Sequence, residues 1–119
     1  MGIVLVLVAV VLSWTVEAAA RGRVGVNPLI GIRVGDVTAS PEAWRAGHRA
    51  ARPLTHTASA VAAGTGVLIS LPSVSENAAG WSVIAACLLI LGLVVAGAMK
   101  ANRAARDAIL ASLASSGRL

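Results

Sequence analysis

The chain has 119 residues, of which 57% are hydrophobic and 13% charged, and its formal net charge is +5. Soluble domains carry about 25% charged residues, so the shortage of polar side chains excludes a water-soluble fold of this length, and the mean hydropathy of +0.83 agrees. A single cysteine excludes a disulfide framework. The positive charge does not indicate nucleic-acid binding, because the apolar residues come in long blocks. The composition indicates a membrane protein.

Three apolar stretches lie at about residues 2–20, 54–72 and 81–99. About 20 helical residues cross a hydrocarbon core of about 30 Å, and a backbone in lipid must satisfy its own hydrogen bonds. The sequence therefore predicts an all-α integral membrane protein with three transmembrane helices in a single domain. A cytoplasmic loop at 21–53, an outside loop at 73–80 and a helical C-terminal tail at 100–119 complete the predicted topology.

The distribution of cations predicts the orientation. Six arginines lie in the loop at 21–53 and the other four Lys and Arg residues follow the third stretch, whereas the loop at 73–80 has none. Since cytoplasmic loops carry the excess of Lys and Arg, the N-terminus is expected outside and the C-terminus in the cytoplasm. Ala18-Ala19-Ala20 resembles a signal-peptide cleavage site, but the positive charge follows the first stretch instead of preceding it. An uncleaved first span is expected.

The first half of the long loop alternates apolar residues with glycines, of which Gly31 is one. This pattern indicates an irregular turn at the headgroup level, in which Asn27 before Pro28 is extended. Arg33 lies inside the turn. Its guanidinium has two interpretations, binding of a lipid phosphate or bonding to backbone carbonyls of the turn.

The second half of the loop predicts an amphipathic helix at about 41–52. Ser40 is expected to cap it, Pro41 suits the first helical position, Glu42 favours the positive end of the helix dipole, and Pro53 ends it. The tail after the third span is predicted to continue as a helix.

Basic and aromatic residues divide the faces of this loop helix. Arg45, Arg49 and Arg52 recur at i, i+4 and i+7, so they form one basic stripe. Trp44 and His48 lie on the adjacent face. The pattern predicts an interfacial helix with Trp44 at the headgroups and the stripe on anionic lipid.

Small residues recur at four-residue spacing in the second span, at Ala58, Ala62 and Gly66. Such spacing lets helix backbones approach closely. Packing inside the chain and docking of a partner protein both explain it.

The candidates for chemistry are few. Glu17, an acidic residue inside a predicted span, is expected to pair with Arg21 one turn later. His48 and His56 have no third ligand at a suitable spacing, and Cys87 is expected to be inert, so neither a metal nor a cofactor is predicted. With no nucleophile–base set or phosphate-binding loop, an enzyme is not expected.

The loop carries a family resemblance over about residues 25–52. It resembles the SdpI family of small bacterial membrane proteins, which is named after an immunity protein. The chain resembles only the C-terminal part of that full-length immunity protein. The residues that carry the resemblance are Asn27, Gly31, Ile32, Arg33, Thr38, Ser40, Trp44, His48 and Arg49. The resemblance implies a multi-pass location in the bacterial plasma membrane and a fold in which this element precedes a pair of membrane helices.

Two functional classes remain open. In the first, the chain is a small membrane interaction protein that binds and modulates or stabilises a membrane partner, as an accessory subunit or in immunity or signalling. In the second, it is a minimal transporter or channel component acting as an oligomer. The third span has no charged residue, which favours the first class.

Overall fold

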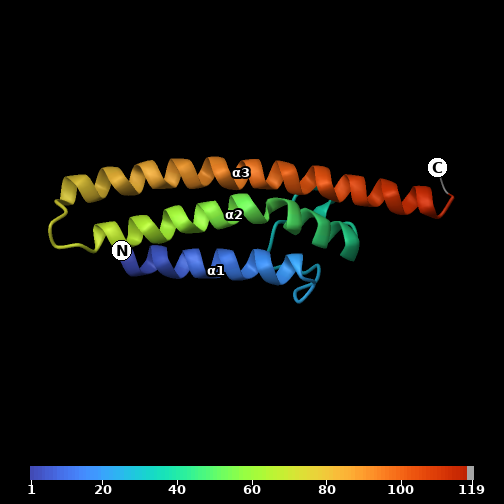
Figure 1. Ribbon diagram of the computed structural model, residues 1–119, viewed down its shortest axis with the longest axis horizontal. Helices are drawn as coiled ribbons and strands as arrows, with labels where there is room; N and C mark the ends of the chain where they lie inside the picture. Colours follow the sequence, from blue (N-terminus) through green and yellow to red (C-terminus); the bar gives the residue numbers. More distant parts are fainter. Residues whose placement is uncertain (118–119) are drawn as a thin grey trace.

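The computed structural model describes residues 1–117, which contain three long helices and one short 3-10 helix. They are α1 (Gly2–Ala20), η1 (Gly35–Thr38), α2 (Pro41–Ile69) and α3 (Glu76–Ser115). The molecule is elongated, with principal extents of 63 × 23 × 20 Å (Figure 1). The prediction of an all-α chain is confirmed.

Helix α2 lies between the other two long helices (Figure 1). Helices α1 and α3 both pack on α2 and, within residues 1–117, not on each other. The small residues of α2 explain how closely the helices pack, because Ala58, Ala62 and Gly66 are all buried. A Cβ on Gly66 would lie only 2.6 Å from the carbonyl oxygen of Gly2 in α1. The stripe therefore serves packing inside the chain, which is one of the two interpretations of its spacing.

Two of the three predicted spans are long and apolar enough to cross a membrane. These are α1, with a mean hydropathy of 2.4, and α3, with 2.6. The predicted second span forms the greater part of α2, which does not reach the same hydropathy. The reason is its composition, because Arg52, His56 and several threonine and glycine residues lower the mean hydropathy of this part of α2.

Helix α2 continues through Pro53, and the prediction of a separate loop helix ending there is wrong. A proline inside a helix removes one backbone hydrogen bond and bends the helix without having to end it. Figure 1 shows α2 changing direction between its blue-green N-terminal part and its yellow-green C-terminal part. The N-terminal signals were correct, since the Ser40 side chain accepts a hydrogen bond from the Ala43 amide at 3.0 Å.

Helix α3 begins at Glu76, five residues before the predicted third span. The Ser75 side chain caps it by accepting from the Ala78 amide at 3.2 Å. The helix then runs without a break to Ser115, so the predicted helical tail is the second part of α3. The last two residues of the predicted tail, 118–119, lie outside the described part of the chain.

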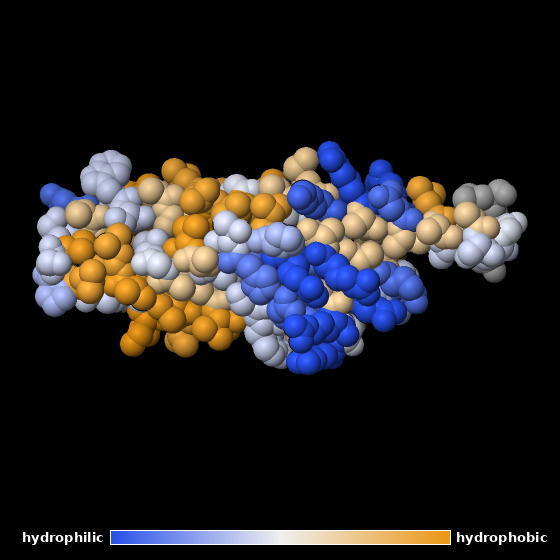
Figure 2. Space-filling view, viewed as in Figure 1, coloured by the Kyte–Doolittle hydropathy of each residue, from blue (hydrophilic) through white to orange (hydrophobic). Residues whose placement is uncertain are grey.

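The exposed apolar residues form a belt over one half of the molecule (Figure 2). Trp81 and Trp14, which are 72% and 57% exposed, lie toward opposite ends of this belt. Tryptophan is enriched at both membrane–water interfaces. In α3 the belt ends at Lys100, and the 19 residues from Trp81 to Met99 rise about 28 Å at 1.5 Å per residue, close to the thickness of a hydrocarbon core.

The best-packed core lies at the other, more charged half. We call this part the cap; it comprises residues 21–52 together with 101–109 of α3. The buried residues of the cap form one core with Ala19 at the end of α1, and they are Val37, Ala43, Trp44, Ala51, Ala101 and Ala105. The loop is therefore a folded element with its own hydrophobic core.

Candidate functional site

Asn27 organises the turn at the start of the cap. Its Oδ1 accepts hydrogen bonds from the amides of Leu29 at 2.9 Å and Ile30 at 2.8 Å, while its Nδ2 donates to the Gly25 carbonyl at 2.8 Å. Side-chain bonds of this kind replace backbone pairing in a turn. Asparagine at this position therefore fixes the path of the loop.

Trp44 is buried in the cap and is only 1% exposed, so the prediction that it lies at the headgroups is wrong. Its Nε1 donates to the Val24 carbonyl at 2.8 Å, and its ring lies 4.3 Å from that of His48. A buried tryptophan requires such an acceptor. The loop covers the face of α2 that was expected to meet the lipid.

His48 connects the loop to α2 through both ring nitrogens. Nδ1 donates to the Trp44 carbonyl at 2.8 Å, and Nε2 accepts from the Ile32 amide at 2.9 Å. One nitrogen donates and the other accepts, so this arrangement fits the neutral ring with its proton on Nδ1. Burial lowers the pKa of His48, because the charged ring loses its hydration.

Gly31 lies directly over these two rings. Its φ of +96° is in the left-handed region, which residues with a side chain rarely adopt. A Cβ there would lie 2.7 Å from Cη2 of Trp44 and 2.8 Å from Nε2 of His48. Glycine is required here both for the turn and for the close contact.

Arg33 lies on the surface of the turn. Its Nη1 donates to the Pro28 carbonyl at 3.1 Å, so the bond to a backbone carbonyl, one of its two interpretations, is present. The remaining donors of the guanidinium are available to other groups in the described structure.

The basic stripe packs against the C-terminal end of α1, and its contact with anionic lipid stays a prediction. Arg49 Nε donates to the Ala20 carbonyl at 3.4 Å, and the Arg45 side chain covers Gly22. Arg52 Nε lies 3.0 Å from Glu17 Oε1. The reason is electrostatic: the C-terminus of a helix is its negative end, and here it also carries a carboxylate.

Glu17 is the centre of a polar cluster between α1 and α2. The predicted pair with Arg21 is confirmed at 3.0 Å, and His56 Nε2 lies 2.9 Å from the other carboxylate oxygen. Ser13 Oγ lies 3.2 Å from His56 Nδ1 and extends the cluster along α1. Sequence reasoning missed the partners on α2. Their positions in the sequence could have indicated them. Two consecutive antiparallel spans bring the end of the first, with Glu17, beside the start of the second, with Arg52 and His56.

Helix α3 closes the cap through residues that were not predicted. The Asn102 side chain accepts from the Asp36 amide at 2.8 Å, and Arg106 Nε donates to the Asp36 carboxylate at 3.0 Å. Gly35, with a φ of +49°, makes room for Asn102, since a Cβ there would collide with that amide. These contacts hold η1 against the tail part of α3.

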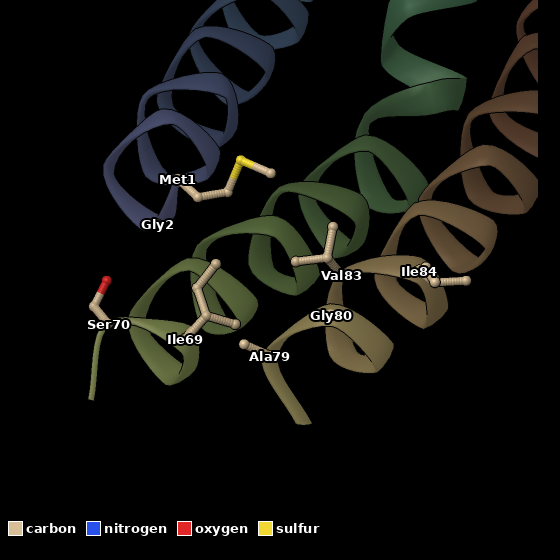
Figure 3. Close-up of a pocket in the computed structure, with 8 residues that line it drawn as sticks. All are labelled: Met1, Gly2, Ile69, Ser70, Ala79, Gly80, Val83 and Ile84. Atoms are coloured by element: carbon tan, nitrogen blue, oxygen red, sulfur yellow. The ribbon is translucent and has the colours of Figure 1, made fainter. Parts of the chain in front are cut away.

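Two hollows open between α1 and α3 over α2. The outer hollow, of about 730 Å³, lies beside the N-termini of α1 and α3 and the end of α2, as Figure 3 shows. The inner hollow, of about 350 Å³, lies where the loop at 30–34 meets the three helices.

These features define a helical membrane protein in which a structured loop folds over the ends of its long helices. The model of the SdpI/YfhL protein family matches residues 23–99, which include most of the cap, all of α2 and the apolar part of α3. The chain therefore belongs to the SdpI/YfhL protein family. Comparison with curated proteins and with solved structures found no match.

The contacts described above give a physical reason for the residues that carry the family resemblance. Asn27, Gly31, Ser40, Trp44 and His48 all fold or hold the cap. Together with the two apolar helices, membership indicates a membrane protein.

Proposed function

We propose that this protein is a three-span plasma-membrane protein of bacteria that binds another membrane protein and modulates or stabilises it, without catalysis. An immunity or signalling role of the SdpI kind falls within this proposal. The observation that carries it is a stripe of exposed apolar residues on α3 that no other part of residues 1–117 covers.

The stripe consists of large apolar residues at alternating three- and four-residue spacing. Ile84, Leu88, Leu91 and Val95 are each exposed by half or more. This spacing is the seam that one helix presents to another in a coiled coil. The small-residue stripe of α2 is buried inside the chain, so the seam on α3 is the better-placed surface for a partner helix.

The proposed topology places the N-terminus outside and the C-terminus in the cytoplasm. It is supported by the packing of α2 alongside α1 and α3, which are both apolar enough to span. It is also supported by charge, because residues 54–99 contain no Lys or Arg. In this orientation the cap is cytoplasmic.

Site-specific photocross-linking tests the proposed partner surface. A photoreactive residue at Leu88 is expected to give a discrete cross-linked protein band in membranes, and adding the changes Leu91→Ala and Val95→Ala is expected to weaken that band. The matched control is the same photoreactive residue at Ala86, which is buried against α2. Cross-linking from Leu88 only to lipid, or equally from both positions, would refute the partner surface.

The second class, a transporter or channel component, has one observation in its favour. Ser13, His56 and Glu17 form a hydrogen-bonded polar chain next to α1 and α2. Toward the other end of these helices, however, Gly2 and Gly66 are in close backbone contact. Between that contact and the polar chain, residues 2–12 of α1 and 57–69 of α2 contain no charged residue and no histidine, so partner binding is the better-supported proposal.

A further inference from the structure

The inner hollow combines apolar walls with one cation at its edge. Arg33 is exposed, and His48 is already bonded through both ring nitrogens. No carboxylate is among the described residues that line this hollow. The apolar walls come from both outer helices and from the loop, and they include Leu12, Val16, Ile30, Ile32, Val94 and Ala98.

The two hollows lie on the same side of the bundle. Thr55 and Ile69, one from each hollow, are 14 residues apart on α2, and Gly80 and Val94 are 14 apart on α3. Fourteen residues are close to four helical turns, so residues at this spacing share a face. Both hollows therefore open on the same side of α2, between α1 and α3.

We propose that the inner hollow holds one acyl chain of an anionic phospholipid whose phosphate contacts Arg33. The guanidinium has five N–H donors, and the bond to the Pro28 carbonyl engages one. Planar guanidinium donors fit phosphate oxygens well. A helix is about 10 Å across and does not enter a hollow of this size, whereas a single acyl chain does.

The depth of the hollow agrees with this occupant. Leu12 and Val16 lie within three turns of the end of α1, and Ala98 lies two residues before Lys100. The hollow is therefore at the level of the leaflet next to the cap. This inference rests on the proposed seating of α1 and α3 in a bilayer.

Native mass spectrometry of the full chain tests the lipid site. The detergent-solubilised protein is offered phosphatidylglycerol and phosphatidylcholine with identical acyl chains. We expect preferential retention of phosphatidylglycerol, and Arg33→Gln is expected to reduce it about tenfold, the effect of losing a charge-assisted hydrogen bond. Arg103→Gln, which alters an exposed cation outside the hollow, is the matched control and is expected to retain the lipid. Equal losses in both variants would overturn the site.

A second variant fills the hollow and leaves Arg33 unchanged. Ala98→Phe is expected to reduce retention of phosphatidylglycerol, whereas Gly92→Phe, on an open part of α3, is expected not to. Folding of each variant is checked by circular dichroism. Unchanged retention by a folded Ala98→Phe variant would refute binding in the hollow.

The alternative occupant of the inner hollow and the face around it is a second copy of the chain. Cys87 is exposed and lies seven residues from both Gly80 and Val94, so it reports on this face. If Cys87 cross-links efficiently to Cys87 of another copy in membranes and no lipid preference is found, the lipid proposal is wrong and a second copy occupies this face. Absence of lipid preference in a chain with the proposed topology refutes the lipid site and leaves the proposed function standing.

Discussion

Replacement of Gly31 by valine is expected to destabilise the cap more than any other single change in the loop. A β-branched residue would have to adopt a φ of +96° and would overlap the rings of Trp44 and His48. Left-handed backbone at a residue with a side chain costs about 1–3 kcal/mol, and overpacking costs a similar amount. A loss of about 2–6 kcal/mol is therefore expected, visible as a lower Tm in detergent and as reduced accumulation in membranes.

Gly25 provides the control for this substitution. It lies in the same loop, its φ is not in the left-handed region, and a Cβ there would meet no atom within 4 Å. Gly25→Val is expected to leave the Tm nearly unchanged. If the two variants melted together at the lower temperature, the close packing of Gly31 on the cap would be disproved.

Replacement of His48 by leucine is expected to destabilise the cap and to change its response to pH. The Ile32 amide loses its acceptor, which costs about 1–3 kcal/mol when the group stays out of water. In the natural chain the folded-state pKa of His48 is lowered, so the unfolded state binds more protons below about pH 6.5. Stability is therefore full above that pH and falls as the pH drops toward the folded-state pKa, by at most about 1.4 kcal/mol per pH unit.

Melting curves between pH 8 and pH 5 measure this dependence. The natural chain is expected to lose stability below about pH 6.5, the unperturbed pKa of histidine, and His48→Leu is expected to be less stable at pH 8 but to lose less on acidification. His56→Gln, a change to the other histidine, is expected to keep the His48-dependent loss. Identical pH profiles for the natural chain and His48→Leu would exclude the neutral, doubly bonded ring.

Local signals in the sequence were sufficient for part of this structure. Long apolar runs predicted α1 and the apolar part of α3, and the Ser40 cap and the Glu17–Arg21 pair were found because both join residues within one turn. The small residues of α2 indicated close packing, but their spacing could not say which helix they meet.

The remainder depends on contacts between distant segments. Trp44 and Arg49 have the composition of an interfacial helix, but the return of the loop buries Trp44 and the C-terminus of α1 gives Arg49 a carbonyl acceptor. The same holds for Asn102, whose partner Asp36 is 66 residues away. The predicted helix end at Pro53 was wrong because a proline can either bend a helix or end it, and packing against neighbouring elements decides which.

Topology reporters measure the central claim, a three-span protein with its cap in the cytoplasm. A reporter joined after Leu119 and another inserted at Gly25 are both expected to be active on the cytoplasmic side. A reporter inserted at Ser75, in the connection between α2 and α3, is expected to be active outside. A Ser75 reporter on the same side as the other two would contradict the account, because α2 and α3 could not then both cross the membrane.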